Sequence, residues 1–165
     1  MSKSEQNLKE AFAGESQANR KYLAFAKKAD EEGYAQAARM FRAAAEAETV
    51  HALAHLRALG AVGATADNLK AAIEGETFEF KDMYPKMIAE AQEEGNKAAE
   101  RSFDYANQVE KIHAELYQKV LDNLTKGEAE YVYWVCPVCG YTCEESYPER
   151  CPVCNAKGSR FIKVD

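Results

Sequence analysis

The chain carries the same short pattern twice, a glutamate three residues before a histidine, in Glu48-x-x-His51 and Glu110-x-x-His113. Only three histidines are present, so the pattern uses two of them. Because three residues make almost one helical turn, both side chains of each pair project from one face of a helix. Two such pairs facing each other would offer four ligands to metal. The alternative is that both pairs lie on solvated helix faces, since short patterns also arise by chance.

The sequence predicts long helices before a compositional change near residue 130. Residues 4–60 are dominated by Ala, Glu, Lys, Arg and Gln, which are strong helix formers. Glycine often closes a helix because it adopts the left-handed conformation. The expected helices cover about residues 4–32, 35–59, 67–94 and 96–126, and they end at Gly33, Gly60, Gly95 and Gly127. A loop at residues 61–65 precedes the third helix, which Thr65 or Asp67 can cap.

Pro85 falls inside the third expected helix. Proline removes one backbone hydrogen bond from a helix interior, at a cost of about 3 kcal/mol unless the helix bends. One interpretation is a plain kink or break. The other, which we favour, is a distortion next to a functional site, because Glu79 lies six residues upstream.

The last part of the chain has the composition of a separate metal-binding module. All five cysteines follow residue 135, and four of them form two pairs, Cys136-x-x-Cys139 and Cys151-x-x-Cys154. Two such pairs complete a tetrahedral four-sulfur site that suits zinc or iron, and the spacing does not separate these metals. The β-prone residues 131–135 and 161–164 predict short strands. Cys143 is left over and is expected to be a free thiol.

Charge and hydropathy exclude other classes of function. The net charge of −6 and pI of about 5.2 argue against a surface that binds nucleic acid or an acidic membrane. No apolar run follows the N-terminus, and no stretch approaches the roughly 20 apolar residues of a membrane span. We therefore expect a cytoplasmic protein without a signal peptide.

Further glutamates lie at suitable places on the other two helices. Helix one offers Glu15, and helix three offers Glu76 and Glu79, one turn apart. With the two Glu-x-x-His pairs they make five carboxylates and two imidazoles, a set that suits iron or manganese. Five buried carboxylates need compensating charge, and two divalent ions leave a net charge of about −1. The set therefore predicts two metal ions.

These pieces together resemble the rubrerythrins. The resemblance rests on Glu15 with Tyr22, both Glu-x-x-His pairs, Gly75-Glu76-x-x-Glu79 followed by Met83-Tyr84-Pro85, and both cysteine pairs, and it covers nearly the whole chain. It implies an all-α, ferritin-like four-helix bundle over residues 1–128. A small β-rich, rubredoxin-like four-cysteine domain would follow over residues 129–165. Asn155 replaces the glycine expected after the second pair, but Asn tolerates a left-handed conformation.

The resemblance also implies roles for single residues. Glu48 and Glu110 would bridge two irons, with Glu15 on the first iron and Glu76 and His113 on the second. Glu79 and His51 would exchange on the first iron with oxidation state, and Tyr22 and Tyr84 would donate hydrogen bonds to ligands. Simple aromatic packing is the alternative for both tyrosines. Cys136, Cys139, Cys151 and Cys154 would hold one iron, although a purified sample can carry zinc. His55 is assigned no ligand role.

The implied activity is that of a non-haem di-iron peroxidase that reduces hydrogen peroxide to water in oxidative-stress defence. Electrons would pass through the Fe(Cys)4 centre from an NADH-linked reductase or a separate rubredoxin. His113 and Lys126 are about 20 Å apart along a helix, so we expect the cysteine iron to lie far from its own di-iron site. A head-to-tail homodimer would bring the centres together. The alternatives are a ferritin-like ferroxidase that handles iron and a non-enzymatic module with a zinc tail.

Overall fold

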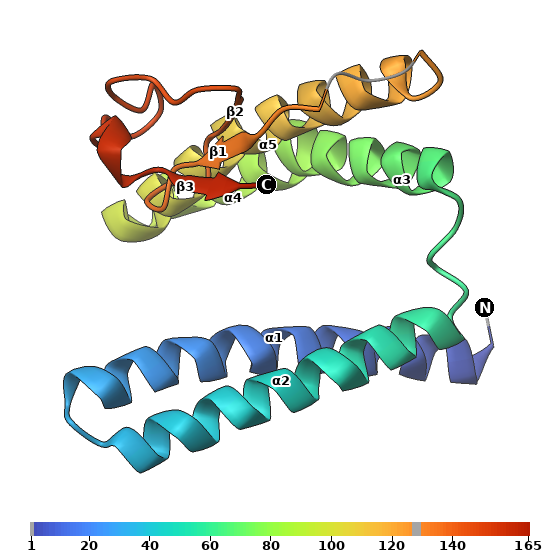
Figure 1. Cartoon of the computed structure of the whole chain (residues 1–165), viewed down its shortest axis with the longest axis vertical. Coiled ribbons are helices and arrows are strands. Elements are labelled where there is room, and N and C mark those ends of the chain that lie inside the picture. The colour runs from blue at the N-terminus through green and yellow to red at the C-terminus, as the bar shows by residue number, and fades with distance from the viewer. Residues whose placement is uncertain (1, 127–129) are drawn as a thin grey trace. The chain divides into compact units, whose positions relative to one another are not determined.

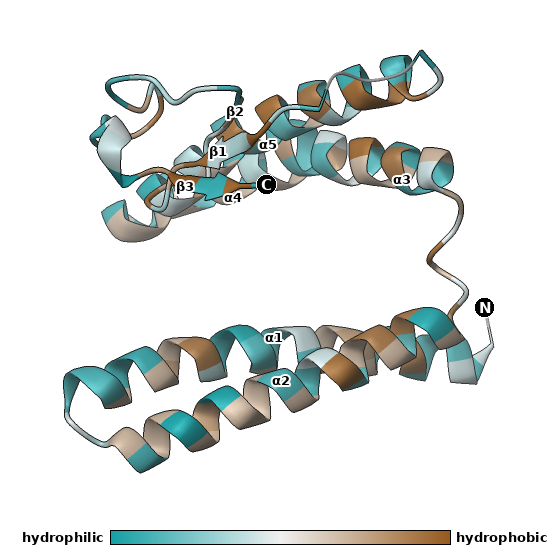
Figure 2. Ribbon diagram, in the orientation of Figure 1, coloured by the Kyte–Doolittle hydropathy of each residue, from teal (hydrophilic) through white to brown (hydrophobic). Residues whose placement is uncertain are grey.

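The structure is a computed structural model that describes residues 2–126 and 130–165 (Figure 1). The chain divides into two compact units, residues 1–63 and 64–165, and each is considered by itself. Among the described residues, no helix is long and apolar enough to cross a membrane. Hydrophilic and apolar residues are interspersed along the helices of both units (Figure 2).

The first unit is a hairpin of two long antiparallel helices, α1 (Lys3–Glu31) and α2 (Ala35–Ala58) (Figure 1). At the start of α1, Ser2 and Glu5 cap each other's backbone amides. The predicted turn at Gly33 is confirmed, with φ at +83°. Small residues let the helices approach closely, because the fully buried positions of the hairpin are all alanine: Ala26, Ala29, Ala38, Ala45 and Ala52.

The second unit begins with a helical layer in which α5 (Lys97–Asn123) packs against α3 (Thr65–Phe78) and α4 (Tyr84–Glu93). A π-helical turn, η1 (Glu79–Met83), joins α3 to α4. Neither Thr65 nor Asp67 caps α3, because Ala64 is its N-cap residue and makes no side-chain hydrogen bond there. The last helix ends at Asn123 rather than near residue 126, and the expected stop at Gly127 lies outside the described residues.

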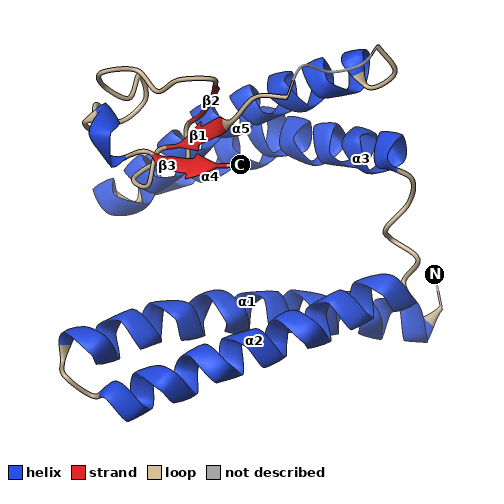
Figure 3. Ribbon diagram, in the orientation of Figure 1, coloured by secondary structure: helices blue, strands red, loops and turns tan. Residues whose placement is uncertain are grey.

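The C-terminal part of this unit is a small three-stranded antiparallel sheet (Figure 3). Its strands are β1 (Tyr133–Val135), β2 (Thr142–Glu144) and β3 (Ile162–Val164), in the order β2-β1-β3. The expected strands near 131–135 and 161–164 are confirmed, whereas β2 was not expected. Two cysteines and one aromatic ring are the buried core, Cys136, Cys151 and Phe161. A core this small needs metal for stability.

The cysteine-containing part folds back onto the middle of α5. Strand β2 contacts α5, and Lys119 of α5 forms an ion pair with Glu144 of β2. At Gly140 the φ angle is +85°, and a Cβ atom there would lie 3.7 Å from Val109 Cγ1. This return of the chain determines which side chains meet near His113. The predicted domain boundary between residues 128 and 129 lies outside the described residues and stays a prediction.

Candidate metal centres

Each unit brings together three of the predicted ligands. In the first unit, Glu15 of α1 meets Glu48 and His51 of α2. His51 Nδ1 lies 2.9 Å from Glu48 Oε2 and 4.0 Å from Glu15 Oε1. The His51 side chain is 56% exposed, and its Nε2 has no hydrogen-bond partner among the described residues. These three residues are called the first trio below.

In the second unit, Glu76 of α3 meets Glu110 and His113 of α5 in a second trio of the same design. His113 Nδ1 lies 2.7 Å from Glu110 Oε2 and 4.0 Å from Glu76 Oε1. In each trio the candidate ligand atoms all lie within 4.8 Å of one another. Each trio is therefore compact enough to hold a metal ion. The exchange of Glu79 and His51 on the first iron and the bridging roles of Glu48 and Glu110 stay predictions.

Crowded carboxylates give the second trio the electrostatics of a cation site. Burial, reinforced by the charge of Glu110, raises the pKa of Glu76 to about 7. Burial and the Glu110 charge also raise the pKa of Glu79, which belongs to neither trio. His113 has a raised pKa because Glu110 hydrogen-bonds its ring. A divalent cation would replace these protons and compensate the charge that they now neutralise.

Glu79 owes its position to the π-helical turn that it begins. Pro85 has no N–H to donate to the carbonyl of Lys81, so α-helical bonding cannot continue through this segment. The Tyr84 N–H donates instead to the Glu79 carbonyl, five residues back, which widens the turn. The favoured interpretation of Pro85, a distortion next to ligand-type residues, agrees with this geometry.

The two tyrosines differ in their surroundings. Tyr22 is half-buried and packs with Phe25 and Phe41, with ring centroids 6.4 and 6.3 Å away, which agrees with the alternative of aromatic packing. Tyr84 has a raised pKa, caused first by burial and then by the charges of Glu79, Glu110 and Glu76. Tyr84 therefore lies in the field of the second trio. A hydrogen-bonding role for either tyrosine stays a prediction, and His55 belongs to neither trio.

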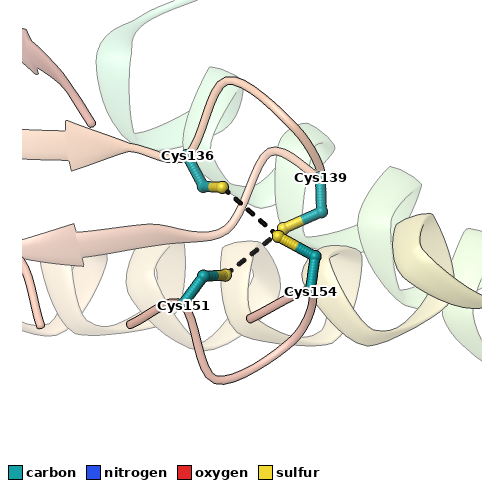
Figure 4. A group of neighbouring side chains, drawn as sticks. All are labelled: Cys136, Cys139, Cys151 and Cys154. Atoms are coloured by element: carbon teal, nitrogen blue, oxygen red, sulfur yellow. Dashed lines mark hydrogen bonds between the residues drawn. The ribbon is translucent and has the colours of Figure 1, made fainter. Parts of the chain in front are cut away.

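The four paired cysteines converge on one point (Figure 4). The Sγ atoms of Cys136 and Cys154 lie 3.6 Å apart, and those of Cys139 and Cys151 lie 3.5 Å apart. A tetrahedron with metal–sulfur bonds of about 2.3 Å has sulfur–sulfur edges of about 3.8 Å, so these separations fit a four-sulfur site. None of the four forms a disulfide.

Both cysteine turns have the same backbone design. The Gly140 N–H donates to the Cys136 carbonyl at 2.9 Å, and the Asn155 N–H donates to the Cys151 carbonyl at 2.9 Å. Asn155 has φ at +61°, so the expectation that asparagine preserves this turn is confirmed. Burial acts to raise the pKa of Cys136, but hydrogen bonds from the backbone amides of Val138 and Cys139 and with the neighbouring thiols together lower it, which favours the thiolate form that binds metal.

Cys143 lies apart from this site. It occupies strand β2, where its Sγ contacts the carbonyl oxygens of Trp134 at 3.8 Å and Ser146 at 3.4 Å. Burial raises its pKa, which disfavours the thiolate that reactive cysteines need. This agrees with its interpretation as an unreactive free thiol.

One sequence-based expectation is wrong: the cysteine site is not remote from the second trio of its own chain. Thr142, three residues after Cys139, places Oγ1 2.9 Å from Nε2 of His113. The chain does not continue outward beyond α5, as the length of the helix suggested, but doubles back along it. Thr142 was missed because no local pattern links residues 29 positions apart.

Tyr117 is a second residue near the site that the sequence did not indicate. Its pKa is raised by burial and then by the charges of Glu76 and Glu110. With Leu69, Leu116, Val120 and Tyr133 it lines a mostly apolar cavity of about 310 Å³ that reaches His113 and Thr142. Its place one turn after His113 was the available signal, but an aromatic residue there is equally suited to core packing.

Comparison with known proteins supplies the relatives of this chain. A family model described as rubrerythrin matches residues 6–121, and one described as the rubrerythrin rubredoxin-like domain matches residues 134–162. Rubrerythrin-2 of Clostridium acetobutylicum is 38% identical, over 93% of this chain and 92% of the relative. Nigerythrin of Nitratidesulfovibrio vulgaris is 39% identical, over 90% and 80% respectively. The solved structure of partially reduced nigerythrin has a TM-score of 0.61 at 35% identity and covers 99% of this chain and 88% of that one.

Proposed function

Because the chain belongs to the rubrerythrin family, with a ferritin-like helical part and a rubredoxin-like domain, we propose that it is a di-iron peroxidase that reduces hydrogen peroxide to water. The family is one of iron-containing oxidoreductases that carry a di-iron site and an Fe(Cys)4 site. The residues present fit both groups. Glutamate and histidine make up both trios, and the four cysteines match a tetrahedral site.

The observation that carries the proposal is that ligands for two kinds of iron site occur in one compact unit, joined by a direct side-chain contact. Thr142 of the cysteine domain meets His113 of the second trio at 2.9 Å. A ferritin-like carboxylate site needs no electron carrier to oxidise or store iron. A peroxidase needs repeated delivery of electrons, so the short connection favours reduction chemistry over a ferroxidase.

The overall reaction consumes one hydrogen peroxide, two electrons and two protons and yields two water molecules. When bound, two ferrous ions supply one electron each, which avoids release of a radical. The two protons would come from a carboxyl group or a bound water molecule at the site. Glu48, Glu110, Glu15 and Glu76 would hold the irons in the roles that the family resemblance implies.

The two histidines have surroundings that support their proposed difference in behaviour. Both ring nitrogens of His113 have partners, Glu110 on one side and Thr142 on the other, and the side chain is 26% exposed. His51 has a partner at Nδ1 alone among the described residues and is 56% exposed. We therefore assign His113 as a permanent ligand and His51 as the ligand that exchanges with Glu79.

The electron donor belongs to the proposal as well. An iron held by the four cysteines would carry one electron at a time, so two deliveries would be needed for each peroxide reduced. We propose an NADH-linked reductase or a separate rubredoxin as the source. We also propose a head-to-tail homodimer, on the family resemblance alone, because the contact of Thr142 with His113 already brings the cysteine domain to the second trio within one chain.

The test is anaerobic reduction of the iron-loaded protein followed by titration with hydrogen peroxide under visible spectroscopy. We expect fast reoxidation of both centres, with one peroxide consumed per two electrons. Spectra that do not change on addition of peroxide would refute the proposal. Ferric iron that accumulates far beyond the number of metal sites would instead identify a ferroxidase. A colourless protein with zinc in the four-cysteine site, isolated from its native source, would identify a non-enzymatic module.

A further inference from the structure

The only described side chain that hydrogen-bonds Nε2 of His113 is Thr142. The Thr142 hydroxyl also lies 3.0 Å from the carbonyl oxygen of Gly140, to which it donates. A threonine hydroxyl has one proton to give. Since that proton goes to Gly140, the oxygen is left to accept a hydrogen bond from His113, and Nε2 must carry a proton.

The direction of these hydrogen bonds determines the tautomer of the His113 ring. A neutral imidazole with its proton on Nε2 has a lone pair on Nδ1. Nδ1 is the nitrogen that faces the carboxylates, 2.7 Å from Glu110 and 4.0 Å from Glu76. In the metal-free chain Nδ1 donates a hydrogen bond to Glu110, so a bound metal ion would take the place of the Nδ1 proton while Nε2 keeps its own.

The same bonds join the second trio to the four-cysteine site. Gly140 follows Cys139 directly in the chain, and its N–H donates to the carbonyl of Cys136. Nε2 of His113 is thus connected to Cys139 by two hydrogen bonds and one peptide link. The hydrogen bonds run from His113 to Thr142 and from Thr142 to the Gly140 carbonyl, and Gly140 is bonded to Cys139 in the chain. The backbone of Gly140 also acts on His113 directly, whereas the ion pair of Lys119 with Glu144 does not involve His113.

We propose that Thr142 is a positioning residue that sets the tautomer and orientation of His113 and couples this ligand to the cysteine domain. The role rests on the proposed function to the extent that His113 binds metal. Partners of this kind raise metal affinity because the ligand no longer has to be ordered on binding. The competing explanation is that the Gly140 carbonyl, which also raises the pKa of His113, orients the ring without help from the hydroxyl.

The test uses the full-length protein with zinc already in the four-cysteine site and compares three variants with the wild type. Thr142→Val removes the hydroxyl but keeps the branched shape that suits strand β2. Thr142→Ser keeps the hydroxyl. Thr125→Val makes the same chemical change at an exposed position after α5 and is the matched control.

Two readouts that do not depend on turnover are measured. Cobalt titration against a competing chelator reports the affinity of the carboxylate site. We expect Thr142→Val to weaken cobalt binding by roughly 10- to 100-fold, and Thr142→Ser and Thr125→Val to resemble the wild type. Nitrogen-15 NMR of the zinc-filled protein should show a protected Nε2 proton on His113 in the wild type and the serine variant, and its loss in the valine variant.

An Nε2 proton missing from zinc-filled wild-type protein would overturn the inference without any variant. Equal cobalt affinities and an unchanged proton signal in Thr142→Val would also overturn it, and would assign the ring orientation to the Gly140 carbonyl. A wild-type protein that binds no cobalt outside the four-cysteine site would instead refute the metal site and, with it, the proposed function.

Discussion

Removal of the Glu76 charge should change how the stability of the metal-free protein depends on pH. The pKa of Glu76 is raised from 4.5 to about 7 in the folded chain, first by burial and then by Glu110. A carboxyl group whose pKa is higher in the folded state favours folding in its protonated form. Its contribution is complete below about pH 4.5 and is lost as the pH rises through about 7.

The size of this effect follows from the shift. Each pKa unit corresponds to about 1.4 kcal/mol, so the full shift would be worth about 3.4 kcal/mol. The Glu76 side chain is 21% exposed, and solvent screens part of the interaction, so we expect about 1–2 kcal/mol. The free energy of unfolding of the wild type should fall by this amount between pH 4.5 and 8 because of Glu76 alone.

The assay is urea denaturation of chelator-treated protein at several pH values, comparing wild type with Glu76→Gln. The neutral glutamine cannot titrate, so the difference between the two curves reports the titration of Glu76 together with its effect on His113, whose pKa the Glu76 charge helps to raise. Glu93→Gln, at an exposed position on α4, is the matched control and should leave the pH profile of the wild type unchanged. Parallel pH profiles for wild type and Glu76→Gln would refute the reasoning.

Three further predictions concern the site and the packing. Glu15→Ala or His113→Ala should abolish peroxide turnover while leaving the visible spectrum of the four-cysteine iron intact; retained turnover would remove the residue from the ligand set. Gly158→Ala should destabilise the cysteine domain by about 3 kcal/mol, because the new Cβ would lie 1.9 Å from the Pro148 carbonyl oxygen; thermal loss of the iron–thiolate absorbance at an unchanged temperature would contradict this. Ala38→Leu should overpack the fully buried contact between α1 and α2 and cost about 1–3 kcal/mol of unfolding free energy, whereas Ala37→Leu, at an exposed neighbouring position, should cost much less.

Local rules were enough to predict the pairing of the candidate ligands along the helices and most of the helices themselves. Spacing of three residues places Glu110 and His113 on one helix face whatever surrounds them, and the hydrogen-bond distance of 2.7 Å agrees. The turn at Gly33 and the left-handed Asn155 likewise depend on residues next to each other in the chain. Helix ends were less predictable, since α5 ends at Asn123, before any glycine.

Features that depend on packing escaped prediction. The π-helical turn could be anticipated as a distortion at Pro85, but its widened hydrogen bonding from Tyr84 to Glu79 could not. Strand β2, the strand that was not expected, has weak strand character by itself and forms because β1 pairs with it. Whether a segment of this kind forms a strand depends on its packing and pairing in the folded domain more than on its own sequence.

The sequence by itself determined the chemistry of this protein: which side chains can bind metal, how they are paired along helices, and that four cysteines form one site. Those properties follow from residue type and short spacing. Tertiary structure alone decided that the cysteine domain returns along α5 and that Thr142 reaches His113. That contact joins residues 29 positions apart. It depends on the packing of β2 and Gly140 against α5, where Gly140 lies close to Val109, and no local pattern encodes this packing.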